Sequence, residues 1–243
     1  MRKYQEEFDK RVAYIRAKLA EAHADGIVFG NSGGKDSALV GILCKAACDN
    51  TLGVIMPCAS SQNYGQDKDD GNALAEQFKI ETRTVDLTAV REAELKALEG
   101  VAVLNDMALT NIAPRLRMTT LYAIAAAENR LVAGTGNRSE IYMGYFTKWG
   151  DGASDFNPIA DLCATEIFDF LRFLKAPASI VEKAPSAGLY EGQTDEKEMG
   201  ISYRAIDDFL LRGEANHYDR AIIDRYHSRS EHKRRLISTF ENP

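Results

Sequence analysis

Apolar residues recur along the chain at two spacings, and each spacing predicts a different element. Residues 4–22 carry apolar side chains three or four positions apart, which indicates an amphipathic helix. Those side chains belong to Tyr4, Phe8, Val12, Ile15 and Leu19. Two short apolar runs follow, at 26–30 and 52–56, with an apolar helical stretch over 36–48 between them. Because a helix between two such runs is typical of parallel strands, we interpret this segment as a strand, a crossover helix and a strand.

The same alternation continues as far as residue 135. The pattern predicts a helix over 68–78, a strand over 82–87, helices between 88 and 128, and a buried strand over 130–135. Strands that alternate with helices form parallel sheets covered on both faces. We therefore predict an α/β fold, with a Rossmann-like parallel sheet and helices on both faces.

The last hundred residues have a different character. Residues 145–162 show no clean period and are rich in Gly, Asp and Asn, a composition typical of functional loops. A helical period returns over 164–174 and 203–226, and a basic segment, SRSEHKRRLISTF, lies near the C-terminus. Since no internal repeat or low-complexity linker interrupts the chain, we expect a single domain spanning residues 1–243.

Composition narrows the class of protein. Of the 243 residues, 45% are hydrophobic and 27% are charged, the balance of a globular chain. The net charge of -6 argues against a protein that coats nucleic acid, which would need many Lys and Arg to displace counterions. No apolar run approaches the roughly 20 residues that cross a bilayer, and the charged N-terminus is unlike a signal peptide. We expect a cytoplasmic protein with no nucleic-acid or membrane partner, whose four cysteines are buried thiols.

The candidate chemistry lies in the Gly-rich turn after the first predicted strand. The turn opens a helix and reads Gly30-Asn31-Ser32-Gly33-Gly34-Lys35-Asp36-Ser37. Unpaired backbone N–H groups and a positive helix end can hold a phosphate there, while Gly33 and Gly34 permit close backbone approach. Asp36 cannot favourably face a phosphate directly, so we expect a divalent cation between the two.

Three functional interpretations fit this turn to different degrees. A Walker A loop is excluded, because that pattern needs Ser or Thr where Asp36 stands and Gly where Phe29 stands. A GxSxG nucleophile elbow matches at Gly30, Ser32 and Gly34, and would make Ser32 a hydrolase nucleophile. The third pattern, the SGGxDS loop of the N-type ATP pyrophosphatases, matches at every fixed position and is the more specific signal.

Segments further along the chain indicate the acceptor. They read GTGNRSE at 134–140, GYFTKWGDGASD at 144–155, PSAGL at 185–189 and EGQTDE at 191–196. Together with SGGKDS, these blocks resemble the ammonia-dependent NAD synthetase family, which implies an adenine nucleotide alpha hydrolase-like fold. The resemblance runs from about residue 25 to 236. In that family the carboxylate of nicotinic acid adenine dinucleotide (deamido-NAD) attacks the α-phosphate of ATP, and ammonia then displaces AMP to form the amide.

The resemblance implies an ATP site that contains magnesium. Residues 30–37 bind ATP, Asp36 and Glu140 hold Mg²⁺, and Ser32 and Asp36 take part in catalysis. Two carboxylates at adjacent strand ends of an open sheet can bracket one metal ion, although Glu140 taken alone would be an ordinary solvated helix residue. The further ATP-contacting positions are Thr135, Ala164 and Ser186.

The same resemblance implies a neighbouring dinucleotide site. Lys148, in the loop over 145–162, is expected to act in catalysis as well as in binding. The basic pair His232 and Lys233 would otherwise belong to a solvated face. The implied contacts to deamido-NAD are Asn111, Arg115, Tyr145, Lys148, Asp151, Asp155, His232 and Lys233.

One position departs from the family pattern. Six residues after Pro158 the family usually carries a Lys that reaches the ATP phosphates, and here Ala164 stands there. Lys35, at the variable position of SGGxDS, either compensates for the missing charge or points into solvent. The substitution bears on ATP affinity and not on the fold. An Ala164→Lys variant with no improvement in the KM for ATP would exclude the idea of a missing clamp.

Other functions stay open at this point. A tRNA-modifying or GMP-forming pyrophosphatase would favour a basic surface or thiol pair, or an appended glutaminase, and none of these is evident. A serine hydrolase would use Ser32, and a non-catalytic adenine-nucleotide sensor would not need paired metal ligands.

The leading prediction is a ligase that amidates deamido-NAD with free ammonia. The length of 243 residues accommodates the synthetase domain without a large glutamine-hydrolysing domain. The resemblance also implies a homodimer. The apolar helices between 103 and 128 could supply its surface, although an ordinary core helix explains them equally well.

Overall fold

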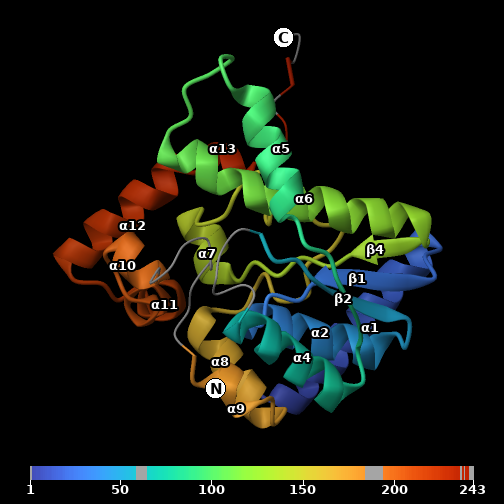
Figure 1. Cartoon of the computed structure of the whole chain (residues 1–243). Helices are drawn as coiled ribbons and strands as arrows, with labels where there is room; N and C mark the ends of the chain where they lie inside the picture. The colour runs from blue at the N-terminus through green and yellow to red at the C-terminus, as the bar shows by residue number, and fades with distance from the viewer. Residues whose placement is uncertain (1, 59–64, 184–193, 236, 238, 241–243) are drawn as a thin grey trace.

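Helices and strands alternate through the first 132 residues, as predicted, in the computed structural model shown in Figure 1. The structure describes residues 2–58, 65–183, 194–235, 237, 239 and 240. The elements of this part of the chain are α1 (Tyr4–Ala22), β1 (Gly26–Gly30), α2 (Lys35–Ala47), β2 (Thr51–Ile55), α4 (Gln66–Phe78), β3 (Glu81–Thr84), α5 (Thr88–Leu98), α6 (Asp106–Ala127) and β4 (Arg130–Val132).

The four strands form one parallel sheet in the order β3-β2-β1-β4, which confirms the predicted α/β fold. The chain first moves outward from β1 through β2 to β3, and then returns to place β4 on the other side of β1. In open α/β sheets, ligands bind at such a reversal, beyond the carboxyl ends of the central strands. Here the reversal brings the turn 30–37, which follows β1, beside the segment that follows β4.

Helices cover both faces of the sheet. Successive residues of β1 point to opposite faces, so they pack against different helices. Ile27 and Phe29 belong to one apolar cluster, which they form with residues of α1, α2, α4 and α8. Val28 belongs to a second cluster on the other face, with Leu52 and Val54 of β2 and residues of α6. Figure 1 shows α6 above the sheet and α1, α2 and α4 below it.

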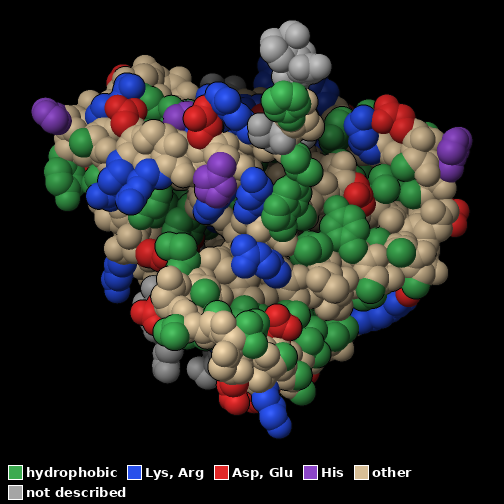
Figure 2. Space-filling model, turned by 90° about the horizontal axis from the view of Figure 1, so that it is seen from above, with side chains coloured by type: hydrophobic (Ala, Val, Ile, Leu, Met, Phe, Trp, Pro, Cys, Tyr) green, Lys and Arg blue, Asp and Glu red, His purple; other side chains and the backbone are tan. Residues whose placement is uncertain are grey.

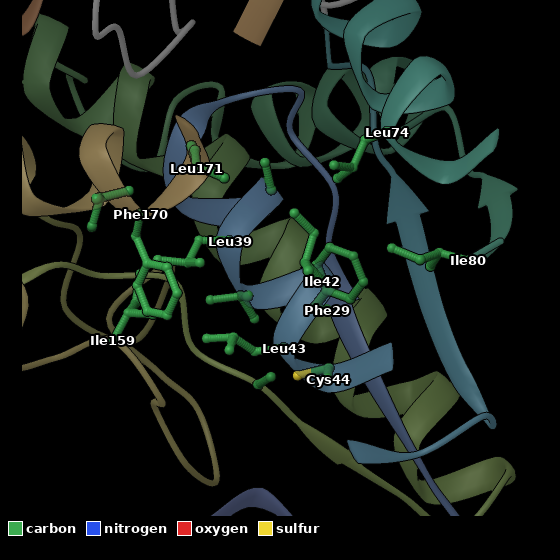
Figure 3. Packing of buried hydrophobic residues seen from close by; sticks show 14 of the residues in the cluster. Phe29, Leu39, Ile42, Leu43, Cys44, Leu74, Ile80, Ile159, Phe170 and Leu171 are labelled. Atoms are coloured by element: carbon green, nitrogen blue, oxygen red, sulfur yellow. The ribbon is translucent and has the colours of Figure 1, made fainter. Parts of the chain in front are cut away.

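Phe29 sets the close approach of α2 to the sheet. A Cβ at Gly41 of α2 would lie 2.6 Å from the Phe29 ring, so the helix can pack there only because residue 41 is glycine. Figure 3 shows Phe29 and Ile42 beside Ile80 in this cluster. The tightly packed core therefore fixes α2, whose first residues belong to the turn 30–37.

The C-terminal part of the chain adds shorter helices and a long loop. Residues 145–162 contain no helix or strand, as predicted. The helices of this part are α7 (Arg138–Met143), α8 (Ala164–Phe173), α9 (Ala178–Val181), α10 (Asp195–Met199), α11 (Tyr203–Arg212), α12 (His217–Arg229) and α13 (Glu231–Arg234).

Three predicted boundaries were wrong. The strand predicted over 82–87 ends at Thr84. The strand predicted over 130–135 ends at Val132, because Ala133 pairs only through an isolated bridge to Phe156. The helical period over 203–226 is divided between two helices. Gly213, with a φ of 74°, ends α11, and the side chain of Asn216 caps the start of α12. No helix in the described ranges is long and apolar enough to span a membrane.

All four cysteines are free thiols, and three of them are buried as predicted. Burial raises the pKa of Cys44 and Cys58, and raises that of Cys163 to about 12. The reactive species is the thiolate, so these three thiols should be inert in the folded protein. We expect DTNB at about pH 8 to label no more than the half-buried Cys48 rapidly, and to label the others only after denaturation. Rapid native labelling of all four would contradict this packing.

Candidate functional site

A cavity of about 1180 Å³ lies at the carboxyl ends of β1 and β4. Its walls come from the turn 30–37, the segment 132–136, α7, and the C-terminal helices α12 and α13. One face of α6 completes it, through residues three or four positions apart: Met107, Thr110, Asn111, Pro114, Arg117, Met118 and Leu121. Pockets for a single small ligand measure roughly 300–1,000 Å³, so this cavity has room for more than one such molecule.

The turn 30–37 is packed against α4. Gly33 has a φ of 70°, and a Cβ at this position would lie 2.1 Å from the carbonyl oxygen of Asp67. Asn31 is buried, and its Nδ2 donates to the carbonyl oxygen of Gly71 at 2.9 Å. A positive φ combined with a backbone contact leaves room only for glycine at residue 33. The turn is therefore held in one conformation by the helix beneath it.

Ser32 is exposed at the tip of this turn. Its Oγ lies 3.0 Å from the Oγ of Ser37 and accepts a hydrogen bond from the N–H of Gly34 at 3.3 Å. A nucleophilic serine needs a general base within hydrogen-bond reach, and neither of these partners is one. The geometry of the described residues thus gives no support to the nucleophile-elbow interpretation.

Asp36 and Glu140 are connected through Asn137. The buried Asn137 caps α7: its Oδ1 accepts from the N–H of Glu140, and its own N–H donates to Glu140 Oε2, both at 3.0 Å. Its Nδ2 donates to Asp36 Oδ1 at 3.2 Å. This reciprocal capping box begins at Asn137 and explains why the carboxylate of Glu140 turns back toward the strand ends. The two predicted metal ligands therefore share one partner at the same edge of the sheet.

The side chain of Lys35 lies inside the site and not in solvent. It is 6% exposed, and its Nζ lies 2.6 Å from Asp36 Oδ2. Burial would lower the pKa of Lys35, but the charges of Asp36 and Glu140 outweigh it and raise this pKa. Burial, followed by the charge of Asp36, raises the pKa of Glu140 to about 8, although Lys35 opposes that shift.

Two residues of this cluster were missed by the sequence analysis. Tyr203 of α11 is buried, and its hydroxyl donates to Asp195 Oδ2 at 3.0 Å and to Glu140 Oε1 at 3.5 Å. Asp195 is buried at the start of α10, and its charge also acts on Lys35. The EGQTDE block contains Asp195, but nothing in the local pattern singled out its carboxylate.

The donors around Asp36 and Glu140 fit a magnesium ion. Mg²⁺ prefers oxygen ligands, and proteins often hold it with one or two carboxylates together with the phosphates of a nucleotide. In the parts of the chain that the structure describes, no group of three or more His, Cys, Asp or Glu could hold a metal. Such a pair suits an ion that arrives with a nucleotide rather than one fixed by the protein alone.

Ala164 occupies the first position of α8 and is fully buried. Its N–H donates to the Oγ of Ser139 at 3.2 Å, and its side chain packs in a cluster that includes Tyr203. The ammonium of Lys35 lies 5.1 Å from the centre of the Tyr203 ring.

Thr135, a further predicted ATP contact, lines the cavity, whereas Ser186 lies outside the described residues.

Two lysines tie the loop after α7 to α13 at the other end of the cavity. Lys148 Nζ donates to the carbonyl oxygen of His232 at 2.6 Å. Lys233 Nζ donates in return to the carbonyl oxygens of Gly144 at 3.0 Å and Phe146 at 2.8 Å. Figure 2 looks down on the molecule of Figure 1 from above. Lys and Arg side chains gather on its left side, the side on which α12 lies in Figure 1. The cavity is lined at one end by acidic residues, its acidic end (Asp36, Glu140 and Asp195), and at the other by basic residues of α12 and α13, its basic rim (Arg225, Arg229, His232 and Lys233).

Not all of the predicted dinucleotide contacts line the cavity. Five of them line the cavity: Asn111, Tyr145, Asp151, His232 and Lys233. Lys148 lines a smaller adjoining pocket together with Trp149. Arg115 is exposed on α6, where its charge adds to the effect of burial in lowering the pKa of Lys233.

Asp155 and Arg117 differ from the expectation. Asp155 is not among the residues that line the cavity, and its carboxylate accepts hydrogen bonds from the N–H of Val132 at 2.7 Å and the hydroxyl of Tyr122 at 3.2 Å. Arg117 does line the cavity and was missed. Its Nε donates to the carbonyl oxygen of Met56 at 3.1 Å, and burial lowers its pKa. The helical spacing of Pro114, Arg117 and Leu121 is the signal that could have placed it on this face.

Lys183 fixes α4 beneath the turn. Its Nζ lies 2.7 Å from Asp67 Oδ1 and 2.8 Å from Asp70 Oδ2. Asp67 supplies the backbone carbonyl that contacts Gly33, so this ion pair supports the turn through α4. Burial opposes ionisation of Asp70, but hydrogen bonds led by that from Lys183 outweigh it and lower the pKa of Asp70.

Replacing Lys183 with Met is expected to lower the free energy of unfolding by about 3 kcal/mol near pH 7, because buried Asp70 then lacks its cation. A lowered carboxyl pKa contributes stability above the ordinary pKa and loses it as the pH falls. The difference between wild type and Lys183→Met should therefore shrink below about pH 4. Urea unfolding across this range measures it, and a pH-independent difference would contradict the ion-pair account.

Known proteins match nearly the whole chain in sequence and in fold. A family model described as NAD synthase matches residues 7–242 of the chain. The NH₃-dependent NAD⁺ synthetase of Carboxydothermus hydrogenoformans is 45% identical over 236 residues, with 96% of each chain covered. Among solved structures, the NMN synthetase of Francisella tularensis matches with a TM-score of 0.95 at 38% identity, with 100% of both chains covered. The NH₃-dependent NAD synthetase of Campylobacter jejuni matches with a TM-score of 0.80 at 29% identity, with 99% of this chain and 100% of that one covered.

Proposed function

Because the chain belongs to the NAD synthase family and has its adenine nucleotide alpha hydrolase-like fold, we propose that it converts deamido-NAD to NAD with ATP and ammonia. The observation that carries the proposal is the placement of the SGGKDS turn. Its Asp36 faces the same cavity as Glu140, and both are bound to Asn137 at the topological reversal of the sheet. A phosphate-binding turn beside paired carboxylates can hold ATP together with Mg²⁺ for adenylation.

The acidic end of the cavity is the proposed ATP site. Residues 30–37 would hold the polyphosphate through backbone N–H groups and the start of α2. Asp36 and Glu140 would hold Mg²⁺, which when bound neutralises charge on the phosphates. The segment after β4, with Thr135, closes the other side of this site. The fixed turn therefore positions the α-phosphate instead of reacting with it, so that positioning supplies much of the rate.

The basic rim is the proposed site for deamido-NAD. Lys233 and Lys148 hold the loop that flanks it, and Arg117 adds a cation on the α6 wall. An oxygen of the pyridine carboxylate attacks the α-phosphorus, forming an acyl adenylate, which is a mixed carboxylic–phosphoric anhydride, and releasing pyrophosphate. Ammonia then attacks the activated carbonyl carbon, and AMP leaves. A carboxylate resists ammonia until its oxygen becomes part of such a leaving group.

The bond that is cleaved in ATP tests this chemistry. With ATP labelled at the α-phosphate, the label should appear in AMP as the dinucleotide is amidated. Recovery of the label in ADP would exclude attack at the α-phosphate. A serine hydrolase would instead form a covalent adduct at Ser32 with a reactive phosphonate, and we expect no such labelling.

A second candidate substrate is the mononucleotide acid, nicotinic acid mononucleotide. The observation that favours it is the Francisella NMN synthetase, which matches with a TM-score of 0.95, compared with 0.80 for the Campylobacter NAD synthetase. The chemistry at the carboxylate is the same for both substrates. Comparing kcat/KM for the two acids separates the functions, and the proposal requires the larger value for the dinucleotide.

The proposal includes a homodimer of single-domain chains in the cytoplasm, supplied with free ammonia. Support for a dimer comes from apolar side chains exposed near the start of α6. These are Val101 (75% exposed), Val103 (103%) and Met107 (73%). Large apolar groups clustered at one place on a surface favour contact with another protein. Light scattering coupled to size-exclusion chromatography measures the assembly, and a monomer at micromolar concentration would contradict a stable dimer.

A further inference from the structure

Lys35 is the part of the SGGKDS turn that the proposed reaction does not yet use. Its ammonium is surrounded by groups from five elements. Asp36 belongs to α2 and lies 2.6 Å away, while the charges of Glu140 on α7 and Asp195 on α10 act on it. Two aromatic rings complete the surroundings, with ring centres at 5.1 Å for Tyr203 and 5.8 Å for Phe168. These anions and ring faces stabilise the charged form of Lys35 in the free protein.

This ammonium competes directly for the proposed metal ligand. Asp36 Oδ1 accepts from Asn137 Nδ2 at 3.2 Å, and Asp36 Oδ2 accepts from Lys35 Nζ at 2.6 Å. Both oxygens of Asp36 are thus engaged by donors of the protein itself. Each oxygen keeps a second lone pair, but a cation that binds Asp36 Oδ2 comes into close range of the ammonium 2.6 Å from that oxygen. Since two cations repel each other at such short range, the displaced group is expected to be the ammonium.

A Lys35 side chain displaced from Asp36 would have the phosphates of bound ATP within reach. It is the first residue of α2, so its side chain starts beside the backbone that would bind the phosphates. The residue lines the same cavity as Gly34 and Ser37. A lysine side chain has four flexible carbons and three donors, which allow it to change partner without any backbone movement.

We propose that Lys35 is an exchangeable cation: it neutralises Asp36 in the free enzyme, and passes to a phosphate oxygen of ATP when Mg²⁺ takes its place at Asp36. This inference rests on the proposed function, because it assumes that the metal and ATP share the acidic end of the cavity. A fixed counter-ion would stay at Asp36 in both states. The two roles predict different responses to removal of the charge.

The Lys35→Gln variant separates these roles, because the metal and the nucleotide should respond in opposite directions. Without nucleotide, Mn²⁺ as the probe should bind the variant about tenfold more tightly, since it no longer competes with the ammonium. At saturating Mg²⁺, a non-hydrolysable ATP analogue should bind about tenfold more weakly, since a charged phosphate contact is lost. Electron paramagnetic resonance measures the first quantity, and calorimetry measures the second.

Two variants serve as controls. Lys45→Gln removes the same charge near the far end of α2, where Lys45 pairs with Asp49, and both affinities should equal those of the wild type. Lys35→Arg keeps a cation in place, and should shift both affinities less than Lys35→Gln does. Unchanged Mn²⁺ affinity in Lys35→Gln would overturn the exchange, and unchanged affinity for the analogue would overturn the phosphate contact.

A measurement on the wild-type protein covers the case in which Lys35→Gln fails to fold. The ¹⁵Nζ resonance of Lys35, assigned by its absence from Lys35→Arg, should move when Mg²⁺ and the ATP analogue are added together. A resonance that stays in place would overturn the proposal. Neither experiment contains deamido-NAD or ammonia, so a failure of the proposed amidation would be seen separately, in the activity of the wild type.

Discussion

Asp36→Asn is expected to lower kcat/KM for amidation by about 10³-fold while the fold stays intact. The amide keeps the size of the carboxylate, but loses the negative charge that would bind Mg²⁺ and that now pairs with Lys35. Metal stabilisation of a phosphoryl group contributes several kcal/mol, and each 1.4 kcal/mol corresponds to about tenfold in rate. Initial rates measured across Mg²⁺ concentrations should show both a lower maximum and a higher Mg²⁺ requirement.

Asp49→Asn is the matched control for this prediction. Asp49 lies just beyond the C-terminal end of α2, and its side chain is fully exposed. Its substitution changes the net charge of the protein by the same amount and should leave the rate within about twofold of the wild type. If Asp36→Asn lost less than tenfold with an unchanged Mg²⁺ requirement, Asp36 could not be the metal ligand.

Gly33→Ala is expected to raise the KM for ATP by at least about tenfold and to destabilise the fold by about 2 kcal/mol. Residue 33 has a φ of 70°, a conformation that costs an alanine roughly 1 kcal/mol. The new methyl group would also lie 2.1 Å from the carbonyl oxygen of Asp67, so either the turn or α4 must move. A displaced turn no longer presents its N–H groups at the positions that the phosphates need. Steady-state kinetics and urea unfolding measure the two effects.

Gly213→Ala separates the effect of φ from that of the contact. Gly213 has a φ of 74°, close to that of Gly33, but nothing lies within 4 Å of a Cβ built there. This variant should lose about 1 kcal/mol of stability and keep the wild-type KM for ATP. If Gly213→Ala raised the KM for ATP as much as Gly33→Ala does, the contact between the turn and α4 would not be the cause of the kinetic effect.

The sequence predicted those parts of the fold and site that depend on short-range patterns. Three of the four strands were recognised from short apolar runs, the fourth from the strand-like segment 82–87, and Asp36 from the spacing of SGGKDS. Glu140 was recoverable because Asn137 and Glu140 have the spacing of a capping box. Gly213 and Asn216 carried the stop and start signals that divide α11 from α12, but the apolar period over 203–226 masked them.

The remainder of the site depends on contacts between distant segments. Tyr203 reaches the cluster around Lys35 because α11 packs against α7, and the hydroxyl of Tyr203 binds Asp195 of α10. The sequence left two orientations open for Lys35, since the first residue of a helix can point either into a cavity or into solvent. For Asp155 the family resemblance implied a ligand contact, yet in the structure its carboxylate accepts a hydrogen bond from the N–H of Val132 at the end of β4.

We propose that this cavity joins ammonia to the carboxylate of deamido-NAD with cleavage of ATP at the α-phosphate. The most direct test is to incubate the wild-type protein with deamido-NAD, ammonium, ATP and Mg²⁺, and to quantify NAD and AMP as they form. We expect NAD and AMP in equal amounts, with no NAD when any one of the four components is left out. Failure to form NAD from the complete mixture, or formation of ADP in place of AMP, would contradict the account.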